Sequence, residues 1–149
     1  RGAARTGAGG RHWIVAAADR DRSEEANFQL TEVKLGLAPA AISLTLLPRL
    51  NSREAAYTFL AGQPFTADYA QRAGLVTKVV PAAQLEAITA AACDEVTTGS
   101  RQGLRETKGL LNAAMIADID ARGEEIAALS ARLFDSEEAH AAMARFLAR

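Results

Sequence analysis

Apolar positions are strand-like in one short stretch near the start of the chain and helix-like over much of the remaining sequence. Residues 28–35 form an apolar run that ends at Gly36, with Pro39 shortly after it. Strand-forming residues closed by Gly and Pro predict a buried strand that turns sharply at this point. The apolar spacing from Ile42 to Leu50 predicts a helix packed against the body of the protein.

From Asn51 onward the pattern predicts a chain that is mostly helical. Asn51 or Ser52 can cap a helix that stops at Gly62, and Thr66 can cap a second helix that runs to Gly74. Residues 75–80 resemble a strand closed by Pro81. Three more helices are predicted, over residues 85–96, over the region from Gly103 to Phe134 with weak points or breaks at Gly109 and Gly123, and from about Ser136 to Leu147.

Glu32 is the one acid inside the first apolar run, between Thr31 and Val33. Burial disfavours the charged form of a carboxyl group, which suits such a group to proton transfer near neutral pH. Alternatively, Glu32 lies on the solvent side of a half-exposed strand and does no chemistry, because alternate residues of a strand face opposite ways. The pattern alone gives more weight to this second interpretation.

Composition restricts the function only broadly. The chain has 149 residues, 49% of them hydrophobic and 23% charged, which is ordinary for one globular domain. The net charge of −1 gives no reason to expect a nucleic-acid partner, and no apolar run is long enough to span a bilayer. The single cysteine, Cys93, is expected to be a packed, reduced thiol, so a cytoplasmic protein is the default expectation. No His/Cys/Asp cluster has the spacing of metal ligands.

Three segments in the same order resemble the enoyl-CoA hydratase/isomerase (crotonase) family. They read LTEVKLGLAPAAIS at 30–43, AGQPFTA with AGLVTKVVP at 61–81, and LFDSEEA with a closing helix at 133–147. The resemblance covers roughly residues 23–149. It implies an α/β fold of the crotonase-like (ClpP/crotonase spiral) type, of which this chain would hold only the C-terminal portion.

The resemblance also divides the chain. Residues 1–22 would be an atypical Gly/Arg-rich remnant of the oxyanion-loop region, and residues 23–149 the C-terminal part with the helical trimerisation region. Ile14–Asp19 is similar to a small-residue helix of the family, but the following residues lack the apolar strand expected there. A reading-frame slip would explain this departure. Because the chain starts at Arg1 without a Met, we expect a truncated protein with little activity alone.

The resemblance implies a role for particular residues. Glu32 would be the catalytic acid and base, and an amide of Gly9 or Gly10 would bind the thioester oxygen in an oxyanion hole. His12 stands where many hydratases carry a second glutamate, so the chain is similar to the single-glutamate branch. The residues implied to contact CoA or substrate are Pro39, Phe146 and Arg149.

The implied reaction is hydration of a 2-enoyl-CoA thioester in fatty acid or branched-chain acyl-CoA metabolism, which is a lyase activity. No metal or separate cofactor is implied, since coenzyme A is part of the substrate. The implied assembly is a homotrimer or hexamer. An acyl-CoA isomerase or thioesterase of the same fold, and a non-catalytic assembly fragment, remain as alternatives.

Overall fold

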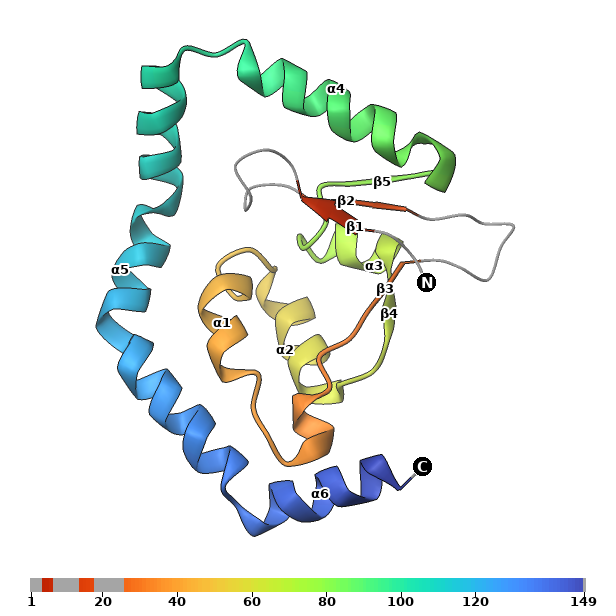
Figure 1. Cartoon of the computed structure of the whole chain (residues 1–149), viewed down its shortest axis with the longest axis vertical. Coiled ribbons are helices and arrows are strands. Elements are labelled where there is room, and N and C mark those ends of the chain that lie inside the picture. Colours follow the sequence, from red (N-terminus) through yellow and green to blue (C-terminus); the bar gives the residue numbers. More distant parts are fainter. Residues whose placement is uncertain (1–3, 7–13, 18–25, 149) are drawn as a thin grey trace. The chain divides into compact units, whose positions relative to one another are not determined.

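The computed structural model describes residues 4–6, 14–17 and 26–148 (Figure 1). Contacts between Cα atoms divide the chain into two compact units, residues 1–28 with 65–111 and residues 29–64 with 112–149. Among the described helices, none has the combined length and apolar character that crossing a membrane requires. The predicted domain limit between residues 22 and 23 lies outside the described residues.

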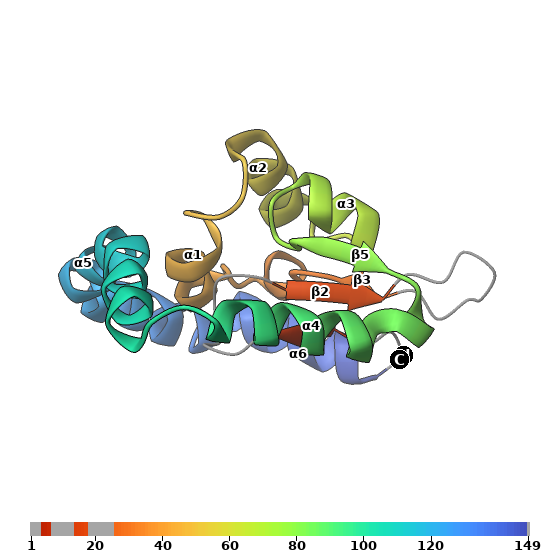
Figure 2. The same cartoon turned by 90° about the horizontal axis from the view of Figure 1, so that it is seen from above.

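The first unit is built on a three-stranded sheet in the order β1-β2-β5. β1 (Ala4–Thr6) pairs antiparallel with β2 (Ile14–Ala17), and β2 pairs parallel with β5 (Lys78–Val80). Helix α3 (Ala67–Arg72) covers one face of β2 and β5, and α4 (Leu85–Thr97) covers the other (Figure 2). The short 3-10 helix η2 (Ala82–Gln84) leads from β5 into α4.

The expected helix at Ile14–Asp19 is wrong, because Ile14–Ala17 forms β2 in the middle of this sheet. Isoleucine and valine at positions 14 and 15 are branched at Cβ, and such residues prefer strands to helices. The parallel register places Ala16 opposite Val79. Residues 18 and 19 lie outside the described part of the chain.

A second pair of strands joins the core of this unit. β3 (Asn27–Phe28) pairs antiparallel with β4 (Phe65–Thr66), and the rings of Phe28 and Phe65 stack with centroids 5.8 Å apart. The buried residues beneath them are Ala26, Ala67, Ala70 and Val76. The strand expected over residues 75–80 is shorter than predicted, because the amides of Leu75 and Val76 donate to the carbonyl of Ala70 instead of extending the sheet.

The second unit packs helices around a small apolar core. Its elements are the 3-10 helix η1 (Glu32–Leu35), α1 (Ala40–Leu46), α2 (Ser52–Ala61), α6 (Glu137–Leu147) and the later part of α5 (Arg101–Phe134). Ala40 and Leu44 of α1 bury against Ile126 of α5, with Ile119 and Leu129 packed around them. Helix α1 begins and ends earlier than predicted, and its Ile42 is 39% exposed, so only one side of it is packed.

Local sequence signals place several helix ends correctly. The side chains of Asn51, Thr66 and Ser136 each accept a hydrogen bond from the backbone three residues later, at 3.0, 3.3 and 3.2 Å. Gly62 ends α2 in the left-handed conformation, with φ of 56°. These four positions follow the ordinary chemistry of helix caps, in which a side-chain oxygen satisfies a free amide and glycine tolerates positive φ.

The breaks predicted at Gly109 and Gly123 are wrong, since α5 is continuous from Arg101 to Phe134. A glycine inside a helix costs only about 1 kcal/mol relative to alanine, and the flanking residues of this long helix keep the hydrogen-bond ladder intact. A Cβ placed at Gly109 would have no neighbour within 4 Å. The glycine therefore reflects no special packing at that position.

The strand predicted over residues 28–35 is also wrong, because the strand ends at Phe28 and Glu32 begins η1. Gly36 closes η1 in the left-handed conformation, with φ of 72°. Leu30 and Leu37, on either side of η1, are both buried. Tertiary packing of these two leucines and the turn at Gly36 override the strand preference of the residues between them.

Candidate active site

Two backbone hydrogen bonds hold Glu32 in place. Its carbonyl oxygen accepts from the amide of Gly36 and, at 2.9 Å, from the amide of Leu37. This paired arrangement requires Gly36 to adopt positive φ, which glycine does without steric cost. The turn after η1 thus fixes the main chain from which the Glu32 side chain projects.

The carboxyl group of Glu32 is the unusual feature of this unit. Its Oε2 atom is buried and has no hydrogen-bond partner within the part of the chain that the structure describes. A buried polar atom without a partner costs free energy, so such atoms are uncommon and call for an explanation. An oxygen in this state can accept a hydrogen bond from a bound water or substrate.

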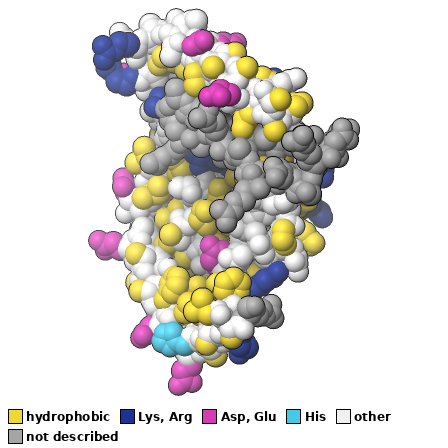
Figure 3. Space-filling view, turned by 45° about the vertical axis from the view of Figure 1, so that its right-hand side comes forward, with side chains coloured by type: hydrophobic (Ala, Val, Ile, Leu, Met, Phe, Trp, Pro, Cys, Tyr) yellow, Lys and Arg dark blue, Asp and Glu magenta, His cyan; other side chains and the backbone are white. Residues whose placement is uncertain are grey.

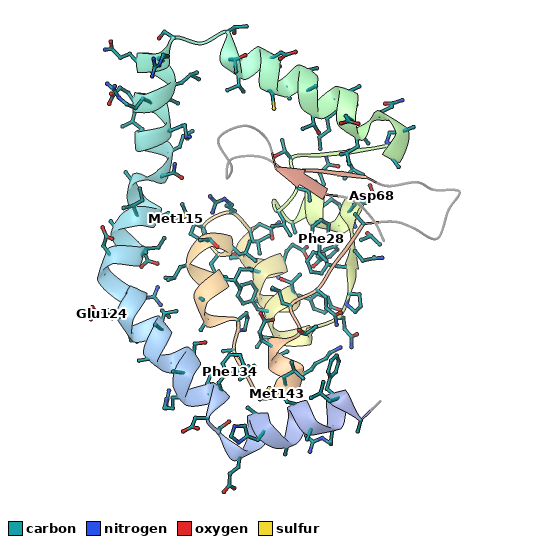
Figure 4. All side chains as sticks on the ribbon, viewed as in Figure 1. Phe28, Asp68, Met115, Glu124, Phe134 and Met143 are labelled. Atoms are coloured by element: carbon teal, nitrogen blue, oxygen red, sulfur yellow. The ribbon has the colours of Figure 1, made fainter. Side chains whose placement is uncertain are left out.

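Helix α6 packs closely against η1 at Gly36. A Cβ at Gly36 would lie 3.2 Å from the amide nitrogen of Ala139 and 3.2 Å from Cγ of Glu138. Ala139 is fully buried. Met143, one turn further along α6, points toward η1 (Figure 4). The start of α6 therefore packs against one side of η1.

The end of α2 approaches η1 as closely. A Cβ at Gly62 would lie 2.8 Å from Cγ1 of Val33 and 3.1 Å from the carbonyl oxygen of Leu30. The amide group of the Gln29 side chain donates to the carbonyl of Gly62 at 2.9 Å. Sequence reasoning predicted Gly62 only as a helix stop and missed both contacts, since nothing in the local pattern indicates a neighbour thirty residues away.

The other predicted site residues are less closely tied to Glu32. Pro39 is half-buried and precedes α1, where its carbonyl accepts from the amide of Ser43 at 3.0 Å. Phe146 is 63% exposed in the last turn of α6, about 10 Å along the helix axis from Ala139. Gly9, Gly10, His12 and Arg149 lie outside the described residues.

Exposed apolar side chains also occur in this unit. Hydrophobic side chains gather toward the lower end of one face, at the height of α6 (Figure 3). By residue, the most exposed large apolar side chains on α2 and α6 are Tyr57, Leu60, Phe146 and Leu147, at 63–84% exposure. Within the described residues, no three His, Cys, Asp or Glu side chains are close enough to hold a metal ion. Among the carboxyl groups that the structure describes in this unit, Glu32 is the one with a buried oxygen that lacks a partner.

Comparison with known proteins decides the family. The family model described as enoyl-CoA hydratase/isomerase matches residues 2–149. The chain belongs to the enoyl-CoA hydratase/isomerase family. A crystal structure of an enoyl-CoA hydratase from Mycobacterium avium is 44% identical, with a TM-score of 0.78 over 81% of this chain and 47% of that one.

Two other members of the enoyl-CoA hydratase/isomerase family are more distant. The enoyl-CoA hydratase/isomerase of Pseudoalteromonas atlantica is 25% identical, with a TM-score of 0.79 over 91% of this chain and 53% of that one. A relative from Thermus thermophilus, named for the hydratase activity, is 33% identical over 90 residues, which are 60% of this chain and 36% of that protein. The chain thus spans about half the length of these relatives or less, and its described elements form part of a crotonase-like fold.

Proposed function

We propose that this chain is the Glu32-bearing part of an enoyl-CoA hydratase that adds water across the double bond of a 2-enoyl-CoA thioester. Glu32 activates the water and delivers a proton to the alpha carbon of the acyl group. Backbone amides stabilise the negative charge that develops on the thioester oxygen, and Gly9 or Gly10 supplies one of them. Coenzyme A enters as part of the substrate, so no further cofactor is needed.

The observation that carries this proposal is the buried, unpartnered Oε2 of Glu32 within the described part of the chain. A surface carboxylate would be solvated, and a purely structural one would accept a hydrogen bond from a neighbour. This oxygen has no partner among the described residues, so a bound water or substrate group would complete its hydrogen bonding. The membership of the family supports the same assignment.

Pro39, Phe146 and Arg149 are assigned to substrate contacts. Pro39 follows Gly36 closely and so borders the turn that holds Glu32. The exposed ring of Phe146 offers an apolar surface, and Arg149 a positive charge that suits a phosphate of CoA. These contacts affect binding more than chemistry, so their removal is expected to raise KM.

The decisive experiment replaces Glu32 by glutamine in the longest form of the protein that the gene encodes. Glutamine keeps the size of the side chain but cannot exchange a proton, so Glu32→Gln is expected to lower kcat for hydration of short 2-enoyl-CoAs by about 10²-fold or more. Glu124→Gln is the matched control, because Glu124 is an exposed acid that points outward from α5 (Figure 4). Equal hydration by the Glu32→Gln variant and the unmodified protein would exclude the proposal.

A second candidate is assembly without catalysis. It is favoured by Leu110 and Leu111 on α5, which are 80% and 65% exposed. Large apolar side chains exposed together are typical of surfaces that bind another protein. A homotrimer or hexamer would use such a surface whether or not the protein is an enzyme. Retention of enoyl-CoA on the protein separates the two candidates, since an assembly module has no reason to bind it.

A further inference from the structure

Gly62 meets η1 on the side that is not occupied by α6. The hypothetical Cβ of Gly62 comes within 2.8 Å of Cγ1 of Val33 and 3.3 Å of Cε of Lys34, the two residues that follow Glu32. It also comes within 3.1 Å of the carbonyl oxygen of Leu30, two residues before Glu32. The space above Gly62 is therefore filled by the segment that carries the acid, on both sides of it.

The contact is more than a helix stop. Asparagine also adopts positive φ and ends helices, so the conformation of Gly62 alone does not require glycine. The 2.8 Å approach to Cγ1 of Val33 adds a second reason for glycine, because real Cβ atoms essentially never come so close to another heavy atom and a neighbour would have to shift. In addition, the side chain of Gln29 donates to the carbonyl of Gly62 and ties the entry of η1 to the same residue.

We propose that Gly62 is a positioning residue for Glu32, which acts by letting η1 lie directly against the end of α2. Gly36 performs the matching task on the other side, where η1 meets Ala139 of α6. The segment thus has a close neighbour at two glycines, where an added Cβ would lie 2.8 Å (Gly62) or 3.2 Å (Gly36) from the nearest heavy atom. A side chain at Gly62 requires the Val33 side chain or its surroundings to shift, and we expect this shift to reach Glu32, the adjacent residue.

This inference rests on the proposed function only for its effect on catalysis, so its test has a structural readout as well. The amide of Leu37 donates to the carbonyl of Glu32, and its hydrogen exchange reports whether η1 keeps its place. Gly62→Ala is expected to speed exchange at Leu37 by roughly tenfold, because local opening follows the loss of packing around a segment. It is also expected to lower kcat by about tenfold with little change in KM, since a misplaced catalytic group weakens the chemical step.

Two further variants separate positioning from a general loss of stability. Val33→Ala removes Cγ1, the atom that the new Cβ would meet first. The double variant Gly62→Ala/Val33→Ala should therefore recover much of the slow exchange and of kcat, although the backbone cost at Gly62 remains. Gly62→Asn tolerates positive φ but keeps the crowding, so it should behave like Gly62→Ala.

The outcomes are distinguishable. If exchange at Leu37 is unchanged in Gly62→Ala, or if the double variant shows no recovery, the positioning role is wrong. If exchange responds as expected while no variant, including the unmodified protein, hydrates enoyl-CoA, then the positioning contact stands and the proposed hydratase activity fails.

Discussion

The packing of Gly36 against α6 makes a quantitative prediction for stability. In Gly36→Ala, the left-handed conformation alone costs roughly 1–2 kcal/mol for a residue with a Cβ. The new Cβ would also lie 3.2–3.3 Å from backbone atoms of Ala139, so α6 must move by a few tenths of an ångström. Together these effects are expected to lower the free energy of unfolding by about 2–3 kcal/mol.

Gly109→Ala is the matched control for this substitution. Gly109 lies inside α5, and a Cβ there has no neighbour within 4 Å. The same chemical change should therefore raise the free energy of unfolding by about 0.5–1 kcal/mol, because alanine loses less backbone entropy than glycine on entering a helix. Opposite signs are expected for the two Gly→Ala changes.

Urea denaturation followed by circular dichroism measures both variants. The midpoint should fall for Gly36→Ala and rise for Gly109→Ala, with similar slopes if the unfolded states are alike. A Gly36→Ala protein within about 0.5 kcal/mol of the unmodified chain would refute the reasoning. It would mean that the start of α6 does not pack closely against η1.

Two other predictions concern burial and assembly. Leu44→Ala should lower the free energy of unfolding by about 2–3 kcal/mol, because it opens a cavity between α1 and α5. Leu147→Ala, at a position that is 84% exposed, should change it by no more than about 0.5 kcal/mol. Thermal denaturation of both variants tests this, and equal effects would contradict the assigned core. Leu110→Glu should reduce self-association in sedimentation experiments. Gln102→Glu, at an exposed position of the same helix, should not. An unchanged oligomer in Leu110→Glu would show that the surface around Leu110 is not part of a subunit interface.

Features that depend on a few neighbouring residues could be predicted from sequence. The caps at Asn51, Thr66 and Ser136 follow from a side-chain oxygen and an amide three residues later. The helices that these caps begin follow in turn from the apolar spacing. The family could be predicted as well, because the three matching segments stand in the family's order.

Resemblance misled the prediction where it was preferred to the residues themselves. Ile14 and Val15 favour a strand by their own chemistry, yet the similarity to a small-residue helix of the family indicated otherwise. The parallel pairing of Ala16 with Val79 follows the intrinsic preference of the segment. At this position, propensity and sheet pairing agree with each other against the analogy.

The surroundings of Glu32 could not be predicted, because they depend on contacts between distant segments. Nothing near residue 32 indicates that its run would leave the sheet after Phe28 and wind into η1. The η1 conformation, unlike a strand, brings this run close to Gly62 on one side and to Ala139 on the other. Both contacts are possible because glycine has no Cβ. A pattern of polar and apolar residues does not show where a missing Cβ allows close packing. Close packing at Gly36 and Gly62 thus contributes to the placement of the acid, together with the buried Leu30 and Leu37, and variants at the two glycines test it without altering the carboxyl group.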